Sequence, residues 1–185
     1  PAAHAAITLG LHHEQQHQEL LLTDCKHLLS CNPLRPAYHA PWPLASVAPA
    51  AHAWVTQAGG PVEIGHDGTG CAFDTETPRH TQWLALHALG NRLITNGNWL
   101  AFVADRGYRD PRWWISAGWD WVQAQGVFAP LYWQHDPGDA SGRDSGWTCF
   151  TLHGQVRIDP NTPVVHINYF EADAFSRWAG ARLPT

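Results

Sequence analysis

Two histidines one helical turn apart form the pattern with the clearest chemical meaning in this sequence. His13 and His17 lie in the stretch LHHEQQHQELLLTDCKH, residues 11–27. In a helix, residues i and i+4 share one face with their Cβ atoms about 6 Å apart, so both imidazoles can bind one metal ion. A polar pair between Leu9 and Leu20 is hard to explain as packing. The spacing therefore predicts a metal site that contains His13 and His17.

The same residues also satisfy the H-E-x-x-H pattern of zinc peptidases, with Glu14 as the general base. Such a peptidase needs a third ligand further along the chain. The metzincin positions hold Leu20 and Thr23 in place of Gly and His, and residues 25–62 contain no Asp or Glu. A zinc hydrolase is therefore a distant alternative.

The neighbouring polar residues do not complete the site in a straight helix. Glu19 lies about 200° around the helix from His17. It is therefore either a hydrogen-bond partner for the metal ligands or for another helix, or a charge that faces solvent. His27 lies on the correct line but about 15 Å from His17. His12 points about 100° away from His13. The third protein ligand is therefore expected on another helix.

The metal motif lies in a helix predicted for residues 5–30. The helix is expected to end at Asn32-Pro33, because the residue before a proline avoids the α region. Residues 33–52 are rich in Pro and Ala and have no periodicity, which predicts a linker. Short apolar runs such as AWVTQ and PVEIG follow and predict strands.

Two further helix signatures occur after residue 90. The first has Thr95 or Asn96 as its cap and Gly107 as its stop. The second has a capping box of Asn168 and Glu171 and ends at Gly180. The residues between these helices, 108–165, are rich in tryptophan and are expected to be mostly loop.

Composition narrows the class of protein. The 185 residues carry a formal charge of −5 with only 11 Lys plus Arg, which argues against nucleic acid or an anionic membrane as partner. No apolar run approaches the roughly 20 residues that span a bilayer. Four cysteines without C-x-x-C spacing indicate free thiols and a cytoplasmic location. The first residue is Pro1 and the chain contains no Met, so a fragment cut at both ends is expected.

The sequence closely resembles the sulfoxide synthases of ergothioneine biosynthesis, the EgtB family. The resemblance is carried by LGLHHEQQHQELLLTDCKHLLSCNPLRPAY, GGPVEIGHDGTGCAFDTETPRH, RLITNGNWLAFVADRGYRDPRWWISAGWDWV and PVVHINYFEADAFSRWAGARLPT. It implies an α+β chain in which residues 1–32 end a DinB-like helical bundle and residues 33–52 form a linker. Residues 53–185 would begin an irregular C-type-lectin-like domain similar to formylglycine-generating enzymes.

The resemblance also implies a chemistry. The family holds non-haem Fe(II) with three histidines, two of which correspond to His13 and His17. It uses O2 to join the sulfur of cysteine or γ-glutamylcysteine to C2 of the imidazole of hercynine. Gln16 is placed to contact that imidazole, and a hydrogen bond from Gln16 to a neighbouring helix is an equal alternative. The third histidine and the family's catalytic tyrosine are expected outside residues 1–185.

Three other functions stay open. The coupling could be directed to C5 of the imidazole, as in ovothiol synthesis, or could join carbon to selenium. A zinc hydrolase and a non-catalytic lectin-like binding module with a relict metal site are more distant. Loss of activity without oxygen would separate the iron enzyme from a zinc hydrolase. Thiol-dependent O2 uptake would separate it from a binding module.

Overall fold

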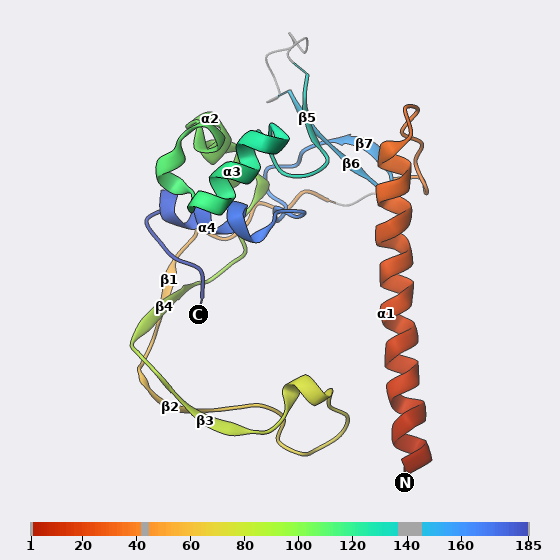
Figure 1. The fold of residues 1–185 in the computed structure, drawn as a ribbon, viewed down its shortest axis with the longest axis vertical. Helices are drawn as coiled ribbons and strands as arrows, with labels where there is room; N and C mark the ends of the chain where they lie inside the picture. Colours follow the sequence, from red (N-terminus) through yellow and green to blue (C-terminus); the bar gives the residue numbers. More distant parts are fainter. Residues whose placement is uncertain (1, 42–44, 137–145, 185) are drawn as a thin grey trace. The chain divides into compact units, whose positions relative to one another are not determined.

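The computed structural model describes residues 2–41, 45–136 and 146–184, and Figure 1 traces the chain through them. Small parts of the predicted segments lie outside these ranges, namely Pro1 of the helical segment, positions 42–44 of the linker, and positions 137–145 and 185 of the lectin-like segment. The chain forms two compact units. Unit 1 contains Pro1–Thr23 and Ala50–Arg92, and unit 2 contains Asp24–Pro49 and Leu93–Thr185.

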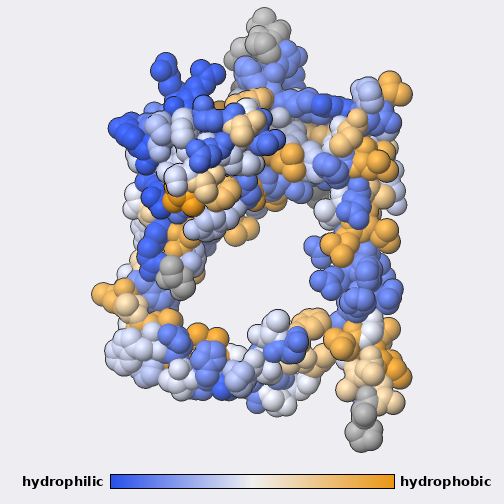
Figure 2. All heavy atoms as spheres, viewed as in Figure 1, coloured by the Kyte–Doolittle hydropathy of each residue, from blue (hydrophilic) through white to orange (hydrophobic). Residues whose placement is uncertain are grey.

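A long helix, α1 (Ala2–Cys31), confirms the helix predicted for residues 5–30. Beyond its end, the Asn32 side chain accepts a hydrogen bond from the Leu34 amide at 2.9 Å, which turns the chain away from the helix axis. Apolar and polar residues are interspersed along α1 in Figure 2, and Leu11 and Leu28 are 64% and 71% exposed. The described chain therefore leaves much of the apolar surface of α1 uncovered.

The strands of unit 1 form a two-stranded antiparallel ribbon. Strand β1 pairs with β4 along Trp54–Gln57 and His87–Gly90, and β2 pairs with β3 along Gly60–Ile64 and His80–Leu84. This confirms the strands predicted from AWVTQ and PVEIG. A short 3-10 turn, η1 (Asp74–Glu76), lies between β2 and β3.

Unit 2 combines three helices with a three-stranded sheet. The helices are α2 (Asn96–Ala104), α3 (Ser116–Gln125) and α4 (Tyr169–Trp178), with 3-10 turns η2 (Gly107–Arg109) and η3 (Pro111–Trp113) between the first two. The antiparallel sheet has the order β5-β6-β7, formed by Trp133–His135, Trp147–Thr151 and Gly154–Arg157. The predicted mixture of helix and sheet is confirmed.

Local capping explains where α4 begins and ends. The Asn168 side chain accepts a hydrogen bond from the Glu171 amide at 3.0 Å, and Glu171 Oε2 accepts one from the Asn168 amide at 2.9 Å. This is the predicted capping box. Gly180 takes a left-handed φ of 69° just beyond the helix, as a stop residue does.

Two features of unit 2 differ from expectation. Helix α2 ends at Ala104, and the left-handed residue after it is Arg106 with φ 62°, so Gly107 is not the helix stop. Gly107 is required for another reason, because a Cβ there would lie 2.1 Å from Cε2 of Phe102. Helix α3 was not predicted, since its glycine and tryptophans form a helix only when packed against Phe170 and the core.

The core of unit 2 is aromatic and contains several of the tryptophans. The rings of Trp99 and Phe175 stack with centroids 4.7 Å apart and an interplanar angle of 9°. Phe102 packs against both α4 and η2, and it is fully buried. The buried cluster consists of Trp99, Phe102, Tyr108, Trp114, Val122, Ala129, Trp133, Ala174 and Phe175. Helices α2 and α4 are therefore held mainly by aromatic packing.

The chain that follows α1 lies along the β6–β7 turn within unit 2. The amides of Tyr38 and His39 donate to the carbonyl of Leu152 at 2.8 and 3.1 Å. Arg35 donates to the side-chain oxygen of Gln155 at 3.2 Å. The first part of the predicted linker is thus hydrogen-bonded to the sheet. None of the described helices is long and apolar enough to cross a membrane.

Candidate metal centre

Helix α1 places His13 and His17 side by side. Their ring centroids lie 4.5 Å apart with an interplanar angle of 88°, and both side chains are exposed. The predicted i, i+4 relation therefore holds on a regular helix. The pair presents four ring nitrogens at the helix surface, where a metal ion and further ligands have room to approach.

The geometry of the pair fits a shared metal ion. The two rings, with centroids 4.5 Å apart, are close enough for one metal ion to be held by both. Neutral imidazole is also the ligand type that non-haem iron, zinc and copper all accept. The donor set by itself therefore fits an iron site but does not select iron over zinc.

The other candidates on α1 do not join the pair. In the described parts of the chain, no group of three His, Cys, Asp or Glu side chains is arranged to hold a metal. Glu14, Gln16 and Glu19 are exposed, as expected for residues facing a further ligand, a substrate or solvent. The ring of His12 lies edge-on to Phe73 with centroids 6.0 Å apart. The metal centre of residues 1–185 thus remains a predicted pair, His13 and His17.

Unit 2 contains a second polar cluster that sequence reasoning missed. Lys26 Nζ lies 2.5 Å from His166 Nε2 and 4.6 Å from the centroid of the Tyr132 ring. His27 Nδ1 lies 3.1 Å from the Tyr132 hydroxyl, and His27 Nε2 lies 3.8 Å from Cys31 Sγ. The only sequence signal is that Lys26 is the single lysine of the chain. Its partner is 140 residues away, so spacing could not reveal the contact.

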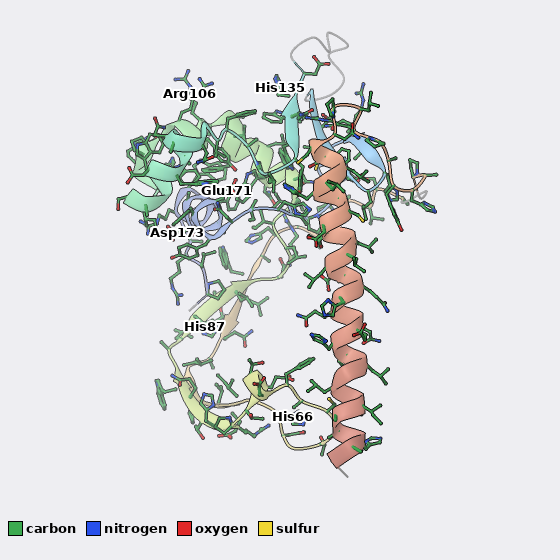
Figure 3. All side chains as sticks on the ribbon, turned by 45° about the vertical axis from the view of Figure 1, so that its right-hand side comes forward. His66, His87, Arg106, His135, Glu171 and Asp173 are labelled. Carbon is green, nitrogen blue, oxygen red and sulfur yellow. The ribbon has the colours of Figure 1, made fainter. Side chains whose placement is uncertain are left out.

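A buried chain of hydrogen bonds links α2, η2 and α4. The Tyr108 hydroxyl donates to Glu171 Oε1 at 2.6 Å and accepts a hydrogen bond from Trp99 Nε1 at 3.2 Å. Burial raises the pKa of Glu171, and burial together with Glu171 raises the pKa of Tyr108. Figure 3 shows Glu171 on α4, within the helical part of unit 2. Because every polar side-chain atom of this trio has a hydrogen-bond partner within unit 2, it is best explained as a structural network.

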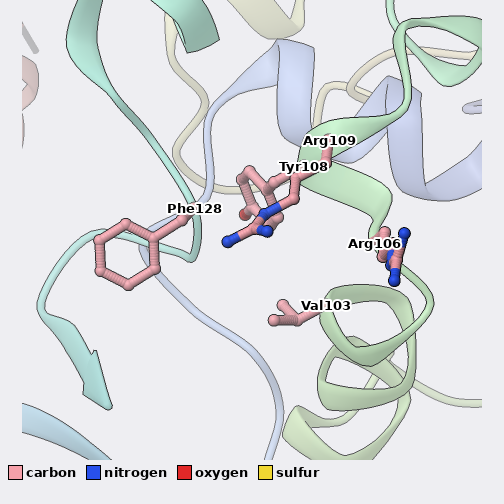
Figure 4. Close-up of a pocket in the computed structure, with 5 residues that line it drawn as sticks. All are labelled: Val103, Arg106, Tyr108, Arg109 and Phe128. Atoms are coloured by element: carbon pink, nitrogen blue, oxygen red, sulfur yellow. The ribbon is translucent and has the colours of Figure 1, made fainter.

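Two cavities of the described chain are lined by residues other than the histidine pair. The first, of about 150 Å³, lies in unit 2 and is lined by Val103, Arg106, Tyr108, Arg109 and Phe128 (Figure 4). The second, of about 450 Å³, lies in unit 1 between β2 and η1, and its lining includes His66, Glu76 and His80. The first is smaller than the roughly 300 Å³ typical of sites for small ligands.

Comparison with known proteins places the chain in a family. Residues 44–185 match the family described as the sulfatase-modifying factor enzyme 1-like domain. The chain is 34% identical over 183 residues to the hercynine oxygenase of Mycolicibacterium smegmatis, an alignment covering 97% of this chain. It is 40% identical over 116 residues to the hercynine oxygenase of Mycobacterium tuberculosis, which covers 62% of this chain. The formylglycine-generating enzyme of Streptomyces coelicolor is 32% identical over 167 residues, 80% of this chain.

These alignments cover most of this chain but only part of each related protein. The aligned part spans 39% of the Mycolicibacterium smegmatis protein and 25% of the Mycobacterium tuberculosis protein, so the chain covers well under half of either. The 97% alignment leaves out about 6 of the 185 residues, and His13 and His17 therefore lie inside it. The chain belongs to the sulfatase-modifying factor enzyme 1-like family, and within it is similar to the hercynine oxygenases.

Proposed function

We propose that this chain is part of a non-haem Fe(II)- and O2-dependent sulfoxide synthase of ergothioneine biosynthesis. The reaction joins the sulfur of cysteine or γ-glutamylcysteine to C2 of the imidazole of hercynine. The observation that carries the proposal is the 97% alignment with a hercynine oxygenase, because it extends through the histidine pair of α1. A match confined to residues 44–185 would support the family alone.

His13 and His17 are the residues that would hold the iron. Bound iron would supply open positions for the thiolate and O2. The i, i+4 spacing keeps both imidazoles on one side of α1, where they would hold the iron together. Gln16 precedes His17 and lies about 60° around the helix from His13. Its amide can both donate and accept, so it can orient a neutral imidazole of hercynine next to the metal.

The same proposal assigns roles to the segments of the chain. Residues 1–32 would belong to a DinB-like helical bundle, and the exposed leucines of α1 are the surface that neighbouring helices would cover. Residues 33–52 would connect this bundle to the lectin-like domain, whose first part is residues 53–185. The four cysteines would remain thiols in the cytoplasm.

The test measures oxygen uptake and product structure together on the full-length protein. Oxygen uptake is followed with Fe(II), hercynine and either cysteine or γ-glutamylcysteine, and the product is examined for a carbon–sulfur bond at C2 or C5 of the imidazole. We expect oxygen uptake that needs both substrates, with a sulfoxide at C2. A product at C5 would assign the enzyme to the ovothiol branch, and substrate turnover without oxygen would refute the proposal.

The chain offers a matched control for the metal ligands. We expect His13→Ala and His17→Ala each to reduce turnover by about 100-fold or more. His12→Ala changes an adjacent histidine that points toward Phe73 and should retain most of the turnover. Gln16→Leu should raise KM for hercynine more than KM for the thiol. Equal losses in all of these variants would indicate damage to α1 and not a loss of ligands.

A further inference from the structure

The end of α1 meets two residues with left-handed backbones. Lys26 lies in the last turns of α1, between Tyr132 just before β5 and His166 just before α4. Tyr132 has φ 72° and His166 has φ 61°. A non-glycine residue in this conformation is strained, so the surrounding contacts must offset that strain.

The two strained residues support each other. The His166 carbonyl accepts a hydrogen bond from the Leu131 amide at 3.3 Å, and the Tyr132 carbonyl accepts one from the Phe150 amide at 3.0 Å. The rings of Tyr132 and His166 meet edge to face with centroids 5.0 Å apart. This arrangement turns the Tyr132 ring and the His166 Nε2 atom toward the same ammonium group. The strain thus coincides with a binding geometry for a cation.

Lys26 has no carboxylate partner among the described residues, since none of their ion pairs includes it. Its ammonium instead faces a ring and an imidazole nitrogen. An ammonium can donate to His166 Nε2 only if that nitrogen carries no proton. His166 must therefore be neutral for the contact to form. Partial burial and the charge of Lys26 both lower the pKa of His166, which keeps it neutral at physiological pH.

We propose that Lys26, Tyr132 and His166 form an acid-sensitive latch that holds the last turns of α1 within unit 2. Protonation of His166 removes the acceptor and places a second cation beside Lys26, so the latch opens in mild acid. This device goes beyond the proposed reaction and does not depend on it. The pKa of His166 is depressed in the folded state. His166 therefore contributes stability above its ordinary pKa of 6.5, and this contribution is lost as the pH falls through the lowered folded-state pKa.

Three other titratable groups face the latch. Burial raises the pKa of the Cys149 thiol, which therefore stays uncharged through this pH range. Cys31 Sγ lies 3.8 Å from His27 Nε2. His27 Nδ1 contacts the Tyr132 hydroxyl, and a hydroxyl can both donate to and accept from an imidazole nitrogen. His166 is thus the group whose protonation opposes the contact directly.

Hydrogen exchange of the full-length protein, read by mass spectrometry on peptides covering residues 24–31, tests the latch. Protection is compared at about pH 7.5 and about pH 5, after correction for the intrinsic exchange rate. We expect the protection of these amides to fall about tenfold in acid. Lys26→Met should show the low value at both pH values. The peptide covering α3 (Ser116–Gln125) provides an internal reference and should not change.

Two histidine variants separate the latch from general acid effects. His166→Asn keeps a residue that tolerates a left-handed φ and an oxygen that accepts from Lys26, but it cannot titrate. It should keep the high protection in acid. His27→Gln should lose protection in acid as the wild type does. Unchanged wild-type protection at low pH, full protection of Lys26→Met at high pH, or acid-sensitive exchange in a folded His166→Asn would each overturn the proposal.

Discussion

Helix α1 and the helices of unit 2 are stabilised in different ways. Leu11 on α1 is 64% exposed, whereas Phe102 on α2 is fully buried and Trp99 is 1% exposed. The helix with the candidate ligands therefore shows an uncovered apolar surface, and unit 2 has a core of its own. The difference indicates that the predicted metal ligands and the aromatic core lie in different parts of this chain. The histidine pair lies on an exposed helix surface, while the aromatic core stabilises unit 2.

The sharpest test of this contrast removes one large apolar side chain from each region. Phe102→Ala should lower the free energy of unfolding of unit 2 by about 3–5 kcal/mol, because it leaves a cavity between α2, η2 and α4. In the chain of residues 1–185, Leu11→Ala should change the free energy of unfolding by less than about 0.5 kcal/mol, because this residue is 64% exposed there. Urea unfolding followed by tryptophan fluorescence measures both. Comparable losses in the two variants would mean that α1 is covered in solution by another part of the protein.

The same change, glycine to alanine, should have opposite effects on stability in unit 2 and in α1. Gly107→Ala should destabilise unit 2 by about 1–3 kcal/mol, since the new methyl group would lie 2.1 Å from the buried Phe102 ring. Gly10→Ala should stabilise α1 by about 0.5–1 kcal/mol, because no atom lies within 4 Å of the added carbon and alanine favours helix. Thermal unfolding followed by circular dichroism checks both. A neutral Gly107→Ala would contradict the close packing of η2 on α2.

The smallest effect is expected from a substitution of the buried carboxyl of unit 2, Glu171. It should change how the free energy of unfolding depends on pH. Burial raises the pKa of Glu171 above its ordinary value of 4.5, so the folded state favours the protonated form. Its contribution is complete below pH 4.5 and is lost as the pH rises through the raised pKa. Glu171→Gln keeps one oxygen that accepts from the Asn168 amide, its NH2 group can donate to the Tyr108 hydroxyl, and it should abolish this part of the slope because it cannot titrate. Urea midpoints at several pH values measure the slope, and an identical slope in the variant would refute this assignment.

The features predicted from the sequence are those set by neighbouring residues. The cap of α4 by Asn168 and Glu171, the end of α1 before Pro33 and the spacing of His13 and His17 each depend on at most a few turns of chain. Such features follow from local hydrogen bonding and helical geometry.

The features that were missed depend on contacts between distant residues. Lys26 and His166 are 140 residues apart, and Tyr108 and Glu171 are 63 apart. Glu171 was identified as half of a capping box, but its second oxygen accepts from Tyr108, which no spacing reveals. Helix α3 was missed because tertiary packing and not intrinsic propensity forms it. The third ligand predicted for the metal site would also depend on a contact between distant residues, since it would come from a separate helix.

In the proposed enzyme, helix α1 contributes His13 and His17 to an iron site. The most direct measurement is the Fe(II) content of the full-length protein and of its His13→Ala, His17→Ala and His12→Ala variants, determined by competition with a chelator under anaerobic conditions. We predict that the first two variants lose iron affinity by about 10–100-fold or more, while His12→Ala binds as the wild type does. Wild-type affinity in His13→Ala or His17→Ala, or an equal loss in His12→Ala, would contradict the assignment.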